Sequence, residues 1–189
     1  MRNWKKLSSA ALAAMVMATV MAGCGGGEKK ADKAASDTIK IGSCFELTGN
    51  VAVYGKSANS GFKMAVEEIN AKGGINGKKL EVVESDNKSE PSESGNAYTK
   101  LINQNKVVAI VGPATSGCVA AGTPICEGSK VPQLAPCATA PNVTVVNGKV
   151  KPFTFRACFI DPFQGKVMAE FADKTLKVKN IAILKDSSS

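Results

Sequence analysis

Short β-branched runs alternate with longer stretches of helical periodicity from Thr38 onward. Such runs, bounded by turn residues, are typical of strands. Six runs fit this pattern: Ile39–Cys44, Leu80–Glu84, Val107–Val111, Val131–Ala135, Phe153–Phe159 and Ile181–Leu184. The pattern therefore predicts strands separated by helices.

Apolar residues spaced three and four positions apart predict four helices. Ser89 and Pro91 would start the second helix, Gly73-Gly74 would end the first, and Asn76-Gly77 predicts a turn directly afterwards. The third helix is expected at 116–129. The apolar stripes are Phe62, Ala65, Val66 and Ile69 in the first helix, Tyr98, Leu101 and Ile102 in the second, Val119 and Ala120 in the third, and Phe163, Val167 and Phe171 in the fourth.

Alternating strands and helices predict an α/β fold with a doubly wound parallel sheet. Ligands bind such sheets beyond the carboxyl ends of the strands, where the strand order reverses. In a flavodoxin-like order this point lies between the first and third strands. The loops Phe45–Gly55 and Gly112–Gly117 would then face a ligand, with Pro136–Pro141 beside them. Because the sequence stops directly after an apolar strand, we expect it to be the N-terminal part of a longer protein.

The N-terminus has the features of an export signal. Basic residues precede an apolar run from Leu7 to Ala22, which is shorter than a bilayer span. Met21-Ala22-Gly23-Cys24 resembles a bacterial lipobox, with Met21 where leucine is most common. We predict a signal peptide at 1–23, lipidation of Cys24 and a flexible tether at 24–37. The alternative is an ordinary signal peptide with an incidental cysteine.

Composition excludes several functions. The chain has 189 residues, of which 44% are hydrophobic and 21% are charged. It contains no histidine, and this absence excludes His-dependent nucleophilic catalysis. No G-x-S-x-G, paired-carboxylate or C-x-x-C motif is present, so we predict no enzyme activity, metal or cofactor. The formal charge is +8, of which residues 1–23 contribute +3 through Arg2, Lys5 and Lys6. The remaining charge of +5 is dispersed, which indicates a solvated surface and no nucleic-acid partner. The segment 49–57 differs from a P-loop, because Asn50 stands where the first glycine is required.

Five cysteines follow Cys24, and their state stays open on the sequence alone. They are Cys44, Cys118, Cys126, Cys137 and Cys158. Cys44, Cys118 and Cys137 lie near predicted strand ends, so a disulfide across the cleft is conceivable. The alternative is that the cysteines fill apolar space.

Two predicted loops carry groups that can bind a small zwitterion. Gly112–Gly117 opens a helix, whose first N–H groups attract anions, and Ser116 adds a hydroxyl. The loop Ala135–Pro141 offers carbonyls, N–H groups and the Thr139 hydroxyl. The alternative is that Ser116 and Thr139 are N-caps.

Several segments resemble the leucine/isoleucine/valine-binding type of periplasmic binding protein. The likeness runs from about Thr38 to the last residue. The matching segments are Ile39–Gly42, Leu47–Gly49, Tyr54-Gly55, Ala65–Leu80, Val111–Ser116, Ala138–Pro141 and Phe155-Arg156. The resemblance implies a type I periplasmic-binding-protein fold, with an N-terminal lobe at 38–158 and a hinge crossing and truncated second lobe at 159–189.

The resemblance also implies a function. The chain would be an extracytoplasmic lipoprotein that binds a branched-chain or related amino acid between two lobes and delivers it to a membrane permease and ATPase complex. Alternatives are a receptor for an amide, urea or aromatic acid, and a sensor not coupled to transport. The implied ligand-binding residues are Tyr54, Thr115, Ser116, Cys137, Ala138, Thr139 and Asp161.

Overall fold

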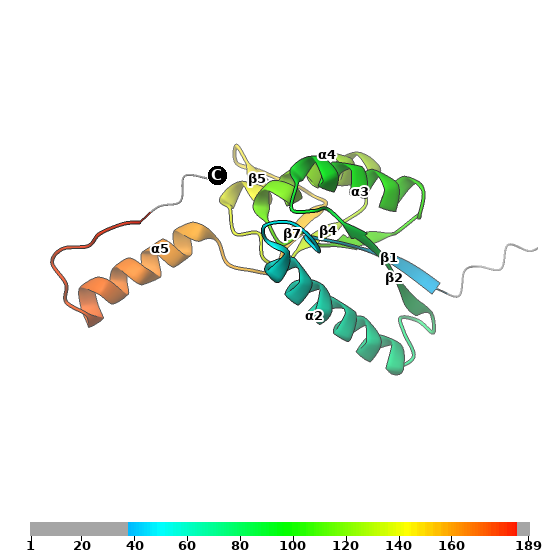
Figure 1. Cartoon of the computed structure of the whole chain (residues 1–189), viewed down its shortest axis with the longest axis horizontal. Helices are drawn as coiled ribbons and strands as arrows, with labels where there is room; N and C mark the ends of the chain where they lie inside the picture. Colours follow the sequence, from blue (N-terminus) through cyan, green and yellow to red (C-terminus); the bar gives the residue numbers. More distant parts are fainter. Residues whose placement is uncertain (1–37, 185–189) are drawn as a thin grey trace, which may run out of the picture. The chain divides into compact units, whose positions relative to one another are not determined.

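The computed structural model describes residues 38–184, which contain an open parallel sheet (Figure 1). Its five strands lie in the order β2-β1-β3-β4-β7, and every neighbouring pair is parallel. The strands are β1 (Thr38–Phe45), β2 (Lys79–Asp86), β3 (Ala109–Val111), β4 (Gln133–Ala135) and β7 (Thr154–Arg156). This flavodoxin-like order confirms the predicted doubly wound fold and places the reversal between β1 and β3.

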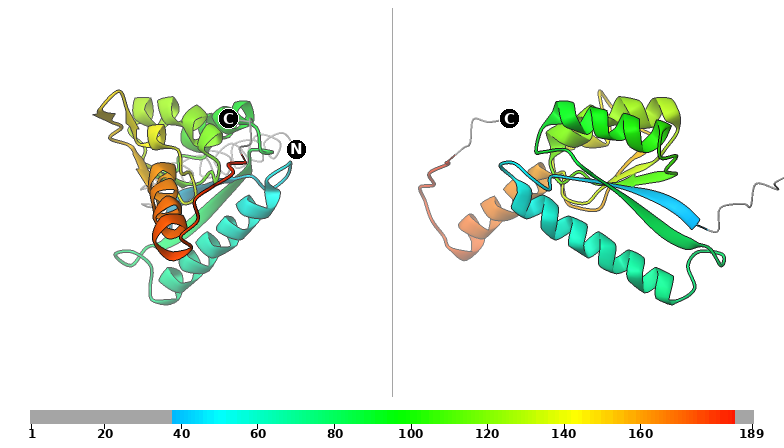
Figure 2. Two further views of the ribbon diagram at one scale, coloured as in Figure 1. Left: turned by 90° about the vertical axis from the view of Figure 1, so that its left-hand side faces the viewer. Right: turned by 45° about the vertical axis from the view of Figure 1, so that its right-hand side comes forward.

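Helices lie on both faces of the sheet. α3 (Pro91–Asn103) and α4 (Ser116–Ser129) lie on one face, and α2 (Ala52–Ala71) lies on the other (Figure 2). α5 (Asp161–Glu170) follows β7 and continues into the π-helical turn η2 (Phe171–Thr175). The short helix η1 (Pro141–Val143) precedes a small hairpin of β5 (Val145–Val146) and β6 (Lys149–Val150).

The local sequence explains the ends of these elements. Pro91 occupies the first turn of α3, where a missing N–H costs nothing. Gly73 and Gly74 follow α2 with positive φ, and Asn76 and Gly77 form the predicted turn, also with positive φ. The third helix occupies the range that was predicted for it.

The core lies between the sheet and the α3–α4 layer. Tyr98 and Leu101 of α3 are fully buried against Cys44 and Ile110 of the sheet. The amide of Gln133 donates to the hydroxyls of Thr123 and Thr154, both at 2.9 Å, and its carbonyl lies 2.7 Å from the Tyr98 hydroxyl. Because each of these buried polar groups has a partner, the network costs little stability.

The C-terminal part differs from the prediction. Residues Ile181–Leu184 are not a strand, since among the described residues no neighbouring strand pairs with them, and Leu184 is fully exposed. In the described part of the chain, the apolar stripe predicted for the fourth helix does not pack against another element. Its residues Phe163, Val167 and Phe171 are all exposed. A strand or an amphipathic helix is stable only against a second surface.

Predictions for the N-terminus lie outside the described residues. These are the signal peptide at 1–23, the lipid site at Cys24 and the tether at 24–37. Within residues 38–184, no helix combines the length and apolarity needed to cross a bilayer.

Candidate functional site

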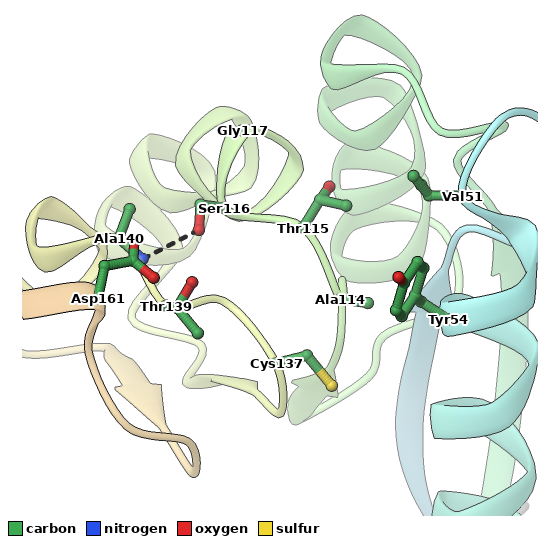
Figure 3. Close-up of a pocket in the computed structure, with 10 residues that line it drawn as sticks. All are labelled: Val51, Tyr54, Ala114, Thr115, Ser116, Gly117, Cys137, Thr139, Ala140 and Asp161. Atoms are coloured by element: carbon green, nitrogen blue, oxygen red, sulfur yellow. Dashed lines mark hydrogen bonds between the residues drawn. The ribbon is translucent and has the colours of Figure 1, made fainter. Parts of the chain in front are cut away.

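A cavity of about 410 Å³ lies at the carboxyl edge of the sheet, where the strand order reverses (Figure 3). This volume is in the range of small-molecule sites. The loops after β1, β3 and β4, the first turns of α2 and α4 and the first residue of α5 form its walls. The lining residues are Val51, Tyr54, Ala114, Thr115, Ser116, Gly117, Cys137, Thr139, Ala140 and Asp161.

Six of the seven predicted site residues line this cavity, and Ala138 does not. Ala138 is buried and packs with Val119 and Val143. Its carbonyl accepts hydrogen bonds from the Arg156 guanidinium and the Cys158 thiol, so it holds the loop in place. Spacing along the chain did not reveal that this one residue of the loop turns inward.

Ser116 offers a hydroxyl proton and a helix N-terminus to the cavity. Its oxygen accepts a hydrogen bond from the Ala140 N–H at 3.2 Å, which leaves the hydroxyl proton for a ligand (Figure 3). Ser116 is the first residue of α4, and the N-terminal N–H groups of a helix have no intrahelical partner. The N-cap of α4 is Thr115 and that of η1 is Ala140, neither with a side-chain cap bond, so Ser116 and Thr139 are not caps.

Glu46 supports the Ala114–Ser116 side of the cavity, and this role was not predicted from the sequence. Its buried carboxylate accepts hydrogen bonds from the Ala114 N–H at 2.9 Å and the Thr115 N–H at 3.0 Å. It also accepts the Thr115 hydroxyl proton at 2.7 Å. Both donors of Thr115 are therefore used internally, and only its oxygen lone pairs remain for a ligand. An acid directly after a buried strand was the available signal.

Arg156 holds the other wall. Its guanidinium donates to the carbonyls of Ala138 at 3.1 Å and Ala140 at 2.8 Å, and to the Thr144 hydroxyl at 3.0 Å. A planar guanidinium suits such divergent acceptors. The loop carrying Cys137 and Thr139 is thereby fixed to β7.

The first loop is fixed by Asp86 at the end of β2. Its carboxylate accepts from the Leu47 and Thr48 N–H groups at 2.9 and 3.2 Å, and from the Thr48 hydroxyl at 2.6 Å. The Lys88 N–H donates to it at 2.8 Å. Desolvation raises the pKa of Asp86, but these hydrogen bonds outweigh it, so the pKa lies below its usual value.

Glycines let this loop approach its neighbours. Gly49 has φ of +87°, and a Cβ there would lie 2.3 Å from the Lys88 carbonyl oxygen. At Gly55, a Cβ would lie 2.1 Å from the Glu46 carbonyl oxygen. The start of α2 therefore packs directly on the β1 loop, and Tyr54, which is 69% exposed, stands at the open side of the cavity.

Asp161 is the one carboxylate among the lining residues. Its N–H donates to the Thr139 carbonyl at 3.1 Å, which brings the start of α5 against the β4 loop. The cavity therefore has hydroxyl and N–H donors beside an acidic acceptor. Among the described residues, no three or more His, Cys, Asp or Glu side chains are grouped to hold a metal ion.

In open α/β sheets, small ligands bind at the strand-order reversal, which is where this cavity lies. Residues 38–189 match the model of the family described as periplasmic binding protein, and the chain belongs to this family. The predicted type I periplasmic-binding-protein fold is thereby confirmed.

Three relatives are informative. A leucine-, isoleucine-, valine-, threonine- and alanine-binding protein of Pseudomonas aeruginosa is 38% identical over 80% of this chain and 40% of its own length. The branched-chain amino acid transporter substrate binding protein LivJ of Streptococcus pneumoniae, solved with isoleucine, is 44% identical with a TM-score of 0.70, covering 74% of this chain and 39% of that one. The leucine binding protein LivK of Thermotoga maritima is 40% identical with a TM-score of 0.67, covering 75% and 38%. The chain thus spans about 40% of the length of the Pseudomonas relative.

Proposed function

We propose that this chain supplies the first lobe of an extracytoplasmic receptor for a branched-chain or related amino acid. The observation that carries the proposal is the cavity itself. The Ser116 hydroxyl proton and the N-terminus of α4 suit a carboxylate, while Asp161 and the Thr139 oxygen suit an ammonium group. The relatives named for leucine, isoleucine and valine support this choice of ligand.

The action is binding without turnover. A second lobe would close over the exposed side of the cavity, with residues 159–161 in the crossing between lobes. Ligand would favour the closed state because it contacts both lobes there. The closed receptor would then deliver the amino acid to an ABC permease and its ATPase.

A ligand panel tests the proposal. The complete mature protein is titrated with leucine, isoleucine, valine, amides, urea and aromatic acids, and thermal unfolding is followed. A ligand at a hundredfold excess over its Kd stabilises the folded state by about 2.7 kcal/mol. Stabilisation by a branched-chain amino acid is expected. Stabilisation by an amide, urea or aromatic acid alone would reassign the ligand, and turnover of any ligand would contradict a binding-only role.

The export of the chain is a separate part of the proposal. Cys24, preceded by a lipobox-like sequence, would become the lipidated N-terminus and anchor the receptor to the outer side of the membrane. Mass spectrometry of the N-terminal peptide from the membrane fraction should find a diacylglyceryl group on Cys24. An unmodified Cys24, or cleavage elsewhere, would refute the anchor without touching the ligand assignment.

A further inference from the structure

Cys137 lines the cavity, and Cys158 follows the strand that pairs with β4. The parallel register pairs Ala135 of β4 with Arg156 of β7, and Cys137 and Cys158 each lie two residues further on. Beyond the strands the two segments stay together, because the Ala157 N–H donates to the Ala135 carbonyl and the Asp161 N–H to the Thr139 carbonyl, both at 3.1 Å. The two cysteines lie between these two hydrogen bonds.

The paired strands β4 and β7, which lead to the two cysteines, have a spacing that a disulfide can bridge. Neighbouring strands are about 4.8 Å apart, and disulfides join Cα atoms roughly 4.4–6.8 Å apart. The Cys158 thiol already lies 3.3 Å from the carbonyl oxygen of Ala138, the residue next to Cys137. Burial raises the pKa of the Cys137 thiol, and the second cause of the increase is the neighbouring Cys158.

Access separates this pair from the other described cysteines. Cys137 is exposed and Cys158 is partly exposed, whereas Cys44, Cys118 and Cys126 are buried. Burial also raises the pKa values of those three thiols, that of Cys126 to about 12, so they form few reactive thiolates at neutral pH. An oxidant in solution therefore reaches Cys137 and Cys158 first.

We propose that Cys137 and Cys158 form a reversible disulfide with low-molecular-weight disulfides as oxidant. The thiolate of one cysteine attacks the small disulfide, forming a mixed disulfide and releasing one small thiol. The second cysteine attacks the mixed disulfide, closing the Cys137–Cys158 bond and releasing a second small thiol. The two cysteine thiols lose two electrons and two protons, which the small disulfide takes up as it becomes two thiols.

The bond would connect the cavity wall to the segment entering α5. Cys137 belongs to the β4 loop that lines the cavity (Figure 3). Cys158 precedes Asp161 by three residues. Oxidation would withdraw the Cys137 sulfur from the cavity and join the two segments covalently. The disulfide does not depend on the identity of the ligand, so it stands apart from the proposed function.

Peptide mapping tests the pair directly. The complete mature protein is equilibrated with oxidised and reduced glutathione at several ratios, alkylated, digested with trypsin and analysed by mass spectrometry. Cys137 falls in the peptide 131–149 and Cys158 in 157–166, while the other three fall in 41–56 and 107–130. The expected product joins 131–149 to 157–166, increases with the oxidised fraction and disappears on reduction. Two separately glutathionylated or alkylated peptides, or a bond involving 41–56 or 107–130, would overturn the proposal.

Two variants and one probe make the test specific. Cys158→Ser keeps a hydroxyl that can donate to the Ala138 carbonyl, so the fold should persist while the linked product is lost and glutathione remains on Cys137. Cys126→Ala, at a buried position of α4, should leave the linked product unchanged. Phenylarsine oxide binds where two thiols are neighbours. The reduced wild-type protein should therefore bind one equivalent of phenylarsine oxide. Failure of that binding would overturn the proposal even if a variant does not fold.

Discussion

The Ser116 hydroxyl accepts one hydrogen bond, from the Ala140 N–H, and keeps its proton for a partner in the cavity. If that partner is a ligand carboxylate, the bond is charge-assisted and contributes about 1.5–3 kcal/mol. Ser116→Ala in the complete protein should therefore raise the ligand Kd roughly 10- to 100-fold. Isothermal titration calorimetry measures this change.

A serine away from the cavity gives the matched control. Ser60 donates to the Lys56 carbonyl on the exposed surface of α2. Ser60→Ala should leave the Kd unchanged. An unchanged Kd in Ser116→Ala as well would limit Ser116 to holding the β4 loop.

Asp86 gives a pH-dependent prediction. The folded-state pKa of Asp86 lies below its ordinary value of about 3.9. The charged carboxylate therefore stabilises the folded protein at pH values above about 3.9. This stabilisation is lost as the pH falls through the folded-state pKa. Asp86→Asn should cost about 1–2 kcal/mol at pH 7, discounted for partial exposure. Urea unfolding at several pH values should show this difference shrink in acid.

An exposed aspartate serves as the comparison. Asp173 lies in the exposed turn η2. Asp173→Asn should change the free energy of unfolding by no more than about 0.5 kcal/mol. A difference for Asp86→Asn that stays constant from neutral pH to acid would show that its charge does not stabilise the loop.

The cavity residues differ in how far sequence could predict them. Ser116 and Thr139 were found because each belongs to the connection that follows a strand, and strand ends meet at one edge of a parallel sheet. The positions of Glu46 and Arg156 depend on contacts outside their own segments. Glu46 binds the N–H of Ala114, 68 residues away along the chain. A local sequence pattern cannot predict a contact between residues so far apart in the chain.

At the scale of elements, α3 and α4 pack closely because Gly122 has no side chain. A Cβ at Gly122 would lie 2.5 Å from the Tyr98 ring, which is fully buried. Gly122→Ala should therefore destabilise the fold by about 1–3 kcal/mol, although alanine favours helices. Chemical denaturation measures the change.

Gly128 in the same helix is the control. A Cβ there would meet nothing within 4 Å. Gly128→Ala should be neutral or stabilise by up to about 1 kcal/mol. Destabilisation of the same size in both variants would mean that Tyr98 does not limit the approach of α4.

Helices were predicted better than strands, for a physical reason. Proline and glycine act locally: Gly73 and Gly74 follow the end of α2, and Pro91 begins α3. A strand depends on its neighbours, so the apolar run Ile181–Leu184 was predicted as a strand that the structure lacks. The β3 and β4 ranges were likewise predicted too long, since only residues with pairing partners belong to the ladder.

At the scale of the whole described region, the two sheet faces are covered unequally. α3 and α4 cover one face (Figure 2). On the other face an apolar groove of about 470 Å³ runs over β3, β4 and β7. Leu134 and Phe155, paired across β4 and β7, are 39% and 52% exposed in this groove. Parallel sheets are ordinarily covered on both faces. This face therefore presents apolar surface to solvent in the described chain.

That exposure predicts dye binding by recombinant residues 38–189. Anilinonaphthalene sulfonate should fluoresce in the groove, and Phe155→Thr should reduce the signal because it removes the largest exposed ring there. Threonine suits a strand, so the unfolding free energy should change by no more than about 1 kcal/mol. Val53→Thr removes a 77%-exposed apolar side chain from α2, outside the groove, and should leave the fluorescence unchanged. Equal fluorescence in Phe155→Thr and wild type would contradict this prediction and place the dye at another apolar surface, such as the one that Phe159 and Phe163 line.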